Sequence, residues 1–484
     1  MNTAAVVGPL NQVGVPAVLD SLSGRRIAHL FAVATVGVGS WVGAREPLWF
    51  DEAVTAAVVR RPLVPFLRII TQDEAGMTPY YVGLWVWSQV FRTDFGLTLF
   101  SIVGAATAIW VLVDLLSSAL GRGAALAGGL LMLGSPFFLT YVTEIRAYSW
   151  MMALSALALR SADRWSRSHE QRELRWLAVW CGLLIATHVA ASPYVAVALV
   201  GAFCLWPPRR DRMIRAAWEA ALIVGGIAVM AAPAVIANST QISWIPEMSA
   251  YRTRSQVQIF FGAHGITLWL SVALFVGAAA LLLTNRCVRF ALYWWLCCVL
   301  GSALLAIFSL IEPLWLSRYL AASLPPLVAV QAWSISVVAG VFSSQRERAR
   351  VWVLLVLVLG VRLVTSEPLA SRVSQPNARA AAEWVDENLG IGVLVVAAGD
   401  AMDFYHYFGY RPTIDLTLAH GPETDGVYPE EQSIVGSPDR RLDGMVLVYI
   451  GNGVLKPDTL TEFEGRLYDQ YQFGALSVLK VYPR

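Results

Sequence analysis

Long apolar runs recur along most of this chain, and they limit what it can fold into. They lie at residues 26–44, 96–119, 124–140, 146–162, 173–189, 191–206, 215–237, 264–284, 288–310, 318–342 and 350–366. A helix needs about 20 mostly apolar residues to cross a bilayer. Only 14% of the 484 residues are charged, against about 25% in soluble domains. The sequence therefore predicts an α-helical polytopic membrane protein with about 11 transmembrane helices.

Arginine placement predicts the orientation of these helices. Counted from the first run, alternate loops are rich in arginine: Arg25, Arg26, Arg164, Arg167, Arg172, Arg175, Arg209, Arg210, Arg212, Arg215, Arg286, Arg289, Arg346, Arg348 and Arg350. Basic loops face the cytoplasm. Residues 1–25 are thus expected in the cytoplasm and the C-terminus outside a plasma membrane. The run at 26–44 is long for a cleaved signal peptide, so we expect it to stay as an anchored helix.

The composition changes after residue 366. Short β-branched runs at 393–396, 445–449 and 476–482 are typical of strands. Residues 377–389 and 460–472 have the period of amphipathic helices. We therefore expect a transmembrane domain at 26–366, with an outer loop at 45–95, and a small extracytoplasmic α/β domain at 367–484. Within the transmembrane part, Pro193 leaves open whether 173–206 is two short helices or one broken helix.

Acidic and basic side chains gather where the predicted spans meet the outer face. Asp51 and Glu52 follow the first span, Glu144 and Arg146 lie between the third and fourth, and Arg318 opens the tenth. Carboxylates and arginines at one membrane boundary could abstract a proton and bind a phosphate. They could equally form a structural ion-pair network. Topology alone leaves both interpretations open.

Several segments, taken in order, resemble the GT-C membrane glycosyltransferases, particularly the glycosyltransferase family 39-like bacterial mannosyltransferases and ArnT-like enzymes. The resemblance covers about residues 40–340. Its segments are Leu48–Ala53, Ser135–Phe137, Thr143–Tyr148, Ala186–His188, Trp244–Pro246 and Ser317–Leu320 with Leu324–Pro326. Such enzymes take a sugar from a polyprenyl-phosphate donor and pass it to an acceptor outside the cytoplasm.

The resemblance implies roles for individual residues. Asp51 matches the catalytic acid of the first loop and is expected to be the general base of an inverting reaction or to orient the acceptor hydroxyl, with Glu52 and Glu144 as further catalytic acids. The donor phosphate is expected at Arg146, Arg318 and Tyr319, and the rest of the substrate at Asp73, Tyr80, Tyr81 and His188. Some relatives bind a divalent cation through the first loop, so a metal is possible here. Mannose is the expected sugar, and a lipid, a glycan or a protein the expected acceptor.

Two other functional classes stay open. Charged residues inside a membrane often mark the path of a transported substrate, which keeps a transporter or flippase as the alternative. Against it, the middles of the spans carry almost no charge; Asp114 is the main exception, and it falls toward the cytoplasmic end of its span. A receptor or assembly protein that senses through its outer domain is the third interpretation, and it leaves the acids and arginines unexplained. The net charge of +2 gives no indication of a nucleic-acid partner.

Overall fold

The structure is a computed structural model that describes most of the helical part of the chain and some of the C-terminal part. It describes residues 23–72, 75–208, 210–229, 245, 247–262, 265–284, 289–341, 378–388, 395–398, 406–407, 413–415, 446–450, 468–473 and 476–481. They form two compact units. The first unit takes its residues from 1–43, 67–91 and 95–366, and the second from 44–66, 92–94 and 367–484.

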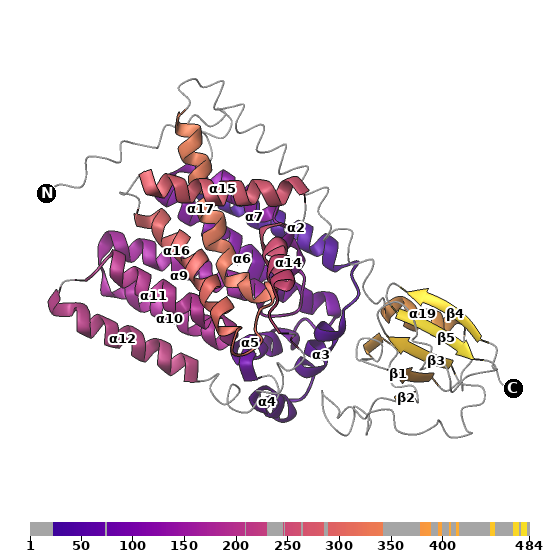
Figure 1. Cartoon of the computed structure of the whole chain (residues 1–484). Helices are drawn as coiled ribbons and strands as arrows, with labels where there is room; N and C mark the ends of the chain where they lie inside the picture. Colours follow the sequence, from indigo (N-terminus) through magenta and orange to yellow (C-terminus); the bar gives the residue numbers. More distant parts are fainter. Residues whose placement is uncertain are drawn as a thin grey trace. The chain divides into compact units, whose positions relative to one another are not determined.

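The first unit is built of helices, labelled in Figure 1. They are α2 (Gly24–Gly43), η3 (Ala75–Met77), α5 (Thr78–Ser88), α6 (Asp94–Leu120), α7 (Arg122–Leu133), α8 (Pro136–Val142), α9 (Tyr148–Ser168), α10 (Gln171–Thr187), η4 (Val189–Ala191), α11 (Ser192–Leu205), α12 (Arg210–Ala228), α14 (Ala250–Phe261), α15 (Gly265–Thr284), α16 (Arg289–Phe308), η7 (Ser317–Ser323) and α17 (Leu324–Val341). Helix α4 (Leu63–Gln72) runs from the second unit into the first, and Asp94, the first residue of α6, belongs to the second unit.

The predicted spans up to residue 342 each overlap a helix or a pair of helices, and the last, at 350–366, lies outside the described residues. Among the described helices, four are long and apolar enough to cross a membrane by themselves, or five if the bent pair α7–α8 counts as one span. Residues 173–206 form two helices, and Pro193 lies in the first turn of the second. The number of eleven spans stays a prediction.

The bend between α7 and α8 follows from local sequence. Pro136 is the first residue of α8, where a missing backbone N–H costs nothing, and the Ser135 hydroxyl accepts a hydrogen bond from the N–H of Phe138 at 3.4 Å. The two helices meet at 65°. This bend directs the end of α8 into the short segment that carries Glu144 and Arg146.

Small and hydroxylated residues let the helices of the first unit pack closely. A β-carbon added at Gly129 of α7 would come within 2.3 Å of the Phe31 ring of α2, so only glycine fits there. The buried Ser155 hydroxyl of α9 donates to the Ala322 carbonyl of η7 at 2.6 Å and lies 2.8 Å from the Tyr194 hydroxyl of α11. Ser155 therefore joins three elements and fixes η7, which carries Arg318, against α9.

The second unit contains α3 (Phe50–Val59), the start of α4, α19 (Ala378–Asn388) and a mixed sheet. Its strands are β1 (Val395–Ala398), β2 (Thr413–Asp415), β3 (Val446–Ile450), β4 (Tyr468–Phe473) and β5 (Leu476–Val481), in the order β2-β1-β3-β5-β4. Strands β2, β1 and β3 are parallel, while β5 and β4 are antiparallel additions.

One prediction for the C-terminal part is wrong. The helix expected over 460–472 is a strand over Tyr468–Phe473, which pairs with β5 from Tyr468 opposite Val481 to Phe473 opposite Leu476. For a short segment, the helical and the extended conformation differ little in free energy. Here the hydrogen bonds between β4 and β5 favour the strand. Residues 460–467 lie outside the described part.

Candidate functional site

The first unit places Glu144 and Arg146 on a short non-helical segment between α8 and α9. Residues 143–147 are non-helical, and the N–H of Arg146 donates to the Glu144 carbonyl at 2.7 Å. Glu144 is almost fully buried, at 4% exposed, and Arg146 is half-buried. Burying a carboxylate costs free energy unless the group is paired or hydrogen-bonded. This tight turn places the charges of Glu144 and Arg146 next to each other where the apolar helices end.

Arg318 and Tyr319 lie on η7, which Ser155 fixes against α9. The Arg318 guanidinium carbon is 5.8 Å from the centre of the Tyr319 ring, a cation–π distance. The Tyr319 ring is 4.7 Å from the His188 ring, and the His188 ring is 6.0 Å from that of Tyr148. A row of aromatic rings thus connects η7 to the first residue of α9.

His188 is the non-helical residue between α10 and η4, and it is 8% exposed. Its Nδ1 accepts a hydrogen bond from the backbone N–H of Ala190 at 3.3 Å. An accepting Nδ1 carries no proton, so the ring presents its Nε2 as the protonated nitrogen. His188 is therefore a neutral, fixed donor beside the ring of Tyr319.

Arg146 also contacts the helix that carries the paired tyrosines. Its guanidinium donates to the Tyr81 hydroxyl at 3.3 Å, and the rings of Tyr80 and Tyr81 lie 5.7 Å apart. Both tyrosines are buried. The sequence separation between Arg146 and Tyr81 is 65 residues, so this contact is a product of the tertiary fold.

The charges of this cluster act on common neighbours. Arg146, Arg318 and Glu144 all interact electrostatically with Tyr148, and both arginines interact with His188. Among these described residues, two guanidinium groups and one carboxylate act on the buried ring of Tyr148. Such an arrangement suits an anion with a planar or ring-shaped substituent. We call Glu144, Arg146, Tyr148, His188, Arg318 and Tyr319 the arginine cluster.

In the second unit, Asp51 and Glu52 open helix α3. Glu52 is 2% exposed, and its Oε2 accepts a hydrogen bond from the backbone N–H of Trp49 at 3.1 Å. This is the carboxylate half of a capping box, and it satisfies an amide that the helix leaves without a partner. Asp51 is half-buried, and its backbone carbonyl accepts from the Thr55 hydroxyl at 2.8 Å. The neighbouring acids therefore differ in surroundings, because only Glu52 is held in the cap.

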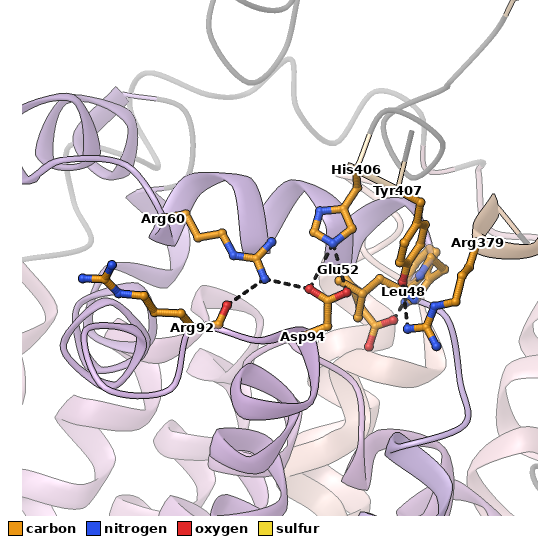
Figure 2. A network of polar contacts seen from close by, with 9 residues as sticks. Leu48, Glu52, Arg60, Arg92, Asp94, Arg379, His406 and Tyr407 are labelled. Carbon is orange, nitrogen blue, oxygen red and sulfur yellow. Dashed lines mark hydrogen bonds and ion pairs between the residues drawn. The ribbon is translucent and has the colours of Figure 1, made fainter. Parts of the chain in front are cut away.

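Both flanks of α3 are bonded to other parts of the second unit (Figure 2). The backbone N–H of Leu48 donates to the Tyr407 hydroxyl at 2.6 Å. Arg60, which follows the helix, donates to Asp94 at 2.7 Å and to the Arg92 carbonyl at 3.0 Å. The sequence assigned no role to His406, yet its Nε2 lies 3.0 and 3.1 Å from the two Asp94 oxygens. No signal in the sequence links positions 312 residues apart.

The predicted site residues thus divide between the two units. The first unit brings together Glu144, Arg146, Arg318, Tyr319, Tyr81 and His188, with Tyr80 beside Tyr81, and the second holds Asp51 and Glu52. Asp73 lies outside the described residues. Where side chains are described, no group of three or more His, Cys, Asp or Glu has the arrangement of a metal site. Sequence reasoning gave no role to Tyr148, although it ends one of the resembling segments.

Asp114, the main charged exception within the predicted spans, has a partner. Arg160 of α9 contacts it at 2.7 Å, and the same guanidinium carbon is 5.4 Å from the centre of the Trp110 ring. The side chains of both charged residues are less than a fifth exposed. The pair joins α6 to α9 and accounts for Asp114 without a transported substrate.

No family model matches the sequence, and no curated protein matches it. The solved structure of ArnT from Cupriavidus metallidurans bound to undecaprenyl phosphate matches with a TM-score of 0.58 at 13% identity, over 93% of this chain and 97% of that one. The arabinofuranosyltransferase AftD from mycobacteria matches with a TM-score of 0.55 at 15% identity, over 96% of this chain, which spans 40% of AftD.

At 13% and 15% sequence identity, these matches show a shared fold and do not show a shared substrate. The match to ArnT covers nearly the full length of both chains. Together with the apolar helices of the first unit, it identifies a multi-pass membrane protein. The chain has the fold of the GT-C membrane glycosyltransferases.

Proposed function

We propose that this protein is a membrane glycosyltransferase whose donor is a sugar linked to a polyprenyl phosphate. The observation that carries the proposal is the arginine cluster, in which Arg146 and Arg318 act on the same buried rings, Tyr148 and His188. ArnT, which has the same fold, was solved with undecaprenyl phosphate bound. A lipid phosphate needs guanidinium groups for its charge and apolar helices for its tail, and the first unit has both.

The reaction explains why arginine is the suitable residue. The acceptor hydroxyl attacks the anomeric carbon while the bond from that carbon to the phosphate oxygen breaks. The bonding electrons stay with the phosphate, which leaves as polyprenyl phosphate and gains a negative charge. Guanidinium groups at Arg146 and Arg318 stabilise this growing charge more in the transition state than in the bound donor, which is the condition for catalysis. Attack opposite the leaving group inverts the anomeric centre.

Asp51 is the proposed general base, which takes the proton of the acceptor hydroxyl. Glu52 is the less suitable base because its carboxylate is engaged by the N–H of Trp49, and we assign it to holding the start of α3. Glu144 is the proposed second acid, beside Arg146. Tyr319 and His188 are proposed to contact the donor next to Arg318, and Tyr80, Tyr81 and Asp73 to contact the remaining substrate. No step is assigned to a metal ion.

The proposed setting is the plasma membrane, with residues 1–25 in the cytoplasm and 367–484 outside. The donor is proposed to carry mannose, and the acceptor is a lipid, a glycan or a protein. The proposed domains are a transmembrane part at 26–366, which includes the loop 45–95, and the α/β part at 367–484.

The test is transfer of radiolabelled mannose from polyprenyl-phosphate mannose to endogenous acceptors. Membranes that contain the protein are compared with membranes that contain the Asp51→Asn form in equal amount. Product formed only with the intact carboxylate supports the proposal, and its anomeric configuration tests inversion. If mannose fails, pentose and other hexose donors follow. Absence of product with all of them, together with movement of the lipid-linked sugar across proteoliposomes, would replace the transferase by the flippase.

A further inference from the structure

Two adjacent residues of the C-terminal region, His406 and Tyr407, reach both flanks of helix α3. On one side, Tyr407 accepts the hydrogen bond from the N–H of Leu48, two residues before the helix begins. On the other side, His406 contacts Asp94, and Asp94 pairs with Arg60, the residue that follows the helix. The helix between these two contacts carries Asp51 in its first turn.

We infer that His406 and Tyr407 are positioning residues that hold α3 at both ends and thereby fix the carboxylate of Asp51. The inference rests on the proposed function, in which Asp51 is the general base. In this inference, part of the C-terminal region supports the catalytic residue of the first loop. A role in selecting the acceptor alone would not require the contacts that His406 and Tyr407 make with the flanks of α3.

A helix as short as α3 needs such support. It has ten residues, and isolated helices below about 12–15 residues are marginal in water. Its entry is tied at two consecutive backbone amides. Leu48 donates to Tyr407, and Trp49 donates to Glu52. Because a general base must lie within hydrogen-bond reach of the proton it removes, a loose helix entry would lower the fraction of molecules in which Asp51 is correctly placed.

The contact at Tyr407 is itself supported. The Arg379 guanidinium of α19 lies over its ring, with the carbon 5.1 Å from the ring centre, and donates to its hydroxyl at 3.5 Å. Burial raises the pKa of Tyr407, so the phenol keeps its proton at neutral pH. Figure 2 shows Tyr407 between Leu48 and Arg379. The ring is therefore held in the orientation that directs its oxygen at the amide of Leu48.

The contact at His406 is a three-membered network. The Arg60 and Asp94 side chains are 34% and 23% exposed, and an isolated pair with that exposure contributes at most about 1 kcal/mol. His406, 11% exposed in its side chain, adds a second donor to the same carboxylate. Networks of this kind restrict geometry more than an isolated pair does, which is what a positioning role requires.

The first test measures transfer by single variants with matched controls. Tyr407→Phe keeps the ring and removes the acceptor oxygen. We expect kcat to fall about three- to tenfold, the range for one lost hydrogen bond, with the donor KM unchanged. His406→Leu should behave alike, whereas His406→Gln, whose amide can still donate to Asp94, should recover most of the rate. Tyr471→Phe, which keeps the ring contact with Trp384, is the control and should have no effect.

A double variant tests whether Tyr407 acts through Asp51. In the Asp51→Asn background the base is already absent, so adding Tyr407→Phe should lower the residual rate no further. An equal additional loss would mean that Tyr407 supports the fold and not Asp51, and it would overturn the inference.

The second test needs no activity. Hydrogen–deuterium exchange of the backbone amides at 48–59 should speed up about three- to tenfold in Tyr407→Phe and stay unchanged in Tyr471→Phe. Unchanged exchange in Tyr407→Phe would overturn the inference whatever the enzyme does, and so would faster exchange with an unchanged kcat. A third outcome is that the unmodified protein transfers no sugar while exchange is still faster in Tyr407→Phe. That result would support the contact that holds α3 and would reject the proposed function.

Discussion

Gln256 of α14 holds the start of η7 through Ser317. Its Oε1 accepts a hydrogen bond from the backbone N–H of Ser317 at 2.5 Å. Ser317 immediately precedes Arg318, and its N–H is one of those that a helix start leaves without an internal acceptor. A side chain 61 residues away in the sequence therefore helps to set the position of a proposed phosphate ligand.

Replacing Gln256 should weaken donor binding. Gln256→Leu removes the acceptor for Ser317, and we expect the donor KM to rise about three- to tenfold, as for one lost hydrogen bond, with a smaller change in kcat. Gln256→Glu keeps an acceptor oxygen and should retain most of the affinity. Gln258→Leu, two positions along the same helix, serves as the control. Equal effects of Gln256→Leu and Gln258→Leu would assign the loss to α14 as a whole.

Arg318→Ala should lower the affinity for polyprenyl phosphate. A hydrogen bond to a charged group contributes about 1.5–3 kcal/mol, so the inhibition constant of undecaprenyl phosphate should rise about tenfold to a hundredfold. Arg318→Lys should recover part of this, because lysine keeps the charge and loses the planar fork. The control is Arg252→Ala on α14, which removes an exposed guanidinium that donates to the Glu247 carbonyl. An unchanged inhibition constant in Arg318→Ala would exclude Arg318 from the phosphate site.

The two acids of α3 should respond differently to amide substitution. Asp51→Asn cannot take a proton and should lower kcat by about 10²–10⁴. Glu52→Gln keeps an oxygen for the N–H of Trp49, so it should retain most of the activity, while Glu52→Ala should lose stability by about 0.5–2 kcal/mol, the range for a lost cap. Rates and thermal unfolding of the purified forms separate the two effects. If Glu52→Gln is inactive and Asp51→Asn is active, the base is Glu52.

The Asp114–Arg160 pair should matter for stability and not for transfer. Removing one partner of a buried pair costs about 3–5 kcal/mol, so Asp114→Leu should clearly lower the unfolding temperature in detergent. Asp114→Leu combined with Arg160→Met leaves no uncompensated charge and should recover most of the loss. The folded double variant should transfer sugar at the normal rate. Loss of activity in that variant would place the pair on a substrate path, as the transporter alternative requires.

Much of the helical part could be predicted from local sequence. The apolar runs at 26–44, 96–119 and 288–310 became α2, α6 and α16 almost to the residue. The run at 124–140 was expected to be continuous and is two helices, although its break at Pro136 has a local cause, because proline and its preceding serine cap a helix start. These features depend on the bilayer requirement that backbone groups bond within their own segment.

Other features depend on contacts between distant parts of the chain. The strand at Tyr468–Phe473 was predicted as a helix because the partner that decides its conformation is another segment. Arg146 and Arg318 could be put forward from the sequence as candidate phosphate ligands. The sequence could not show that Arg146 donates to Tyr81 or that His188 lies beside Tyr319. The segments around Arg146 and Arg318 show which side chains are present. The packing of α9, α10 and η7 determines which of these side chains come into contact.

The sequence by itself determined the class of this protein: a membrane protein with apolar helices, and acids and arginines at their ends. Hydrophobic length and charge placement are local properties, so one segment carries the whole signal. Only the tertiary structure decided that Tyr407 accepts from Leu48 and that Gln256 accepts from Ser317. A hydrogen bond requires donor and acceptor within about 3 Å, and for residues far apart in the chain only the packing of the intervening elements brings them that close.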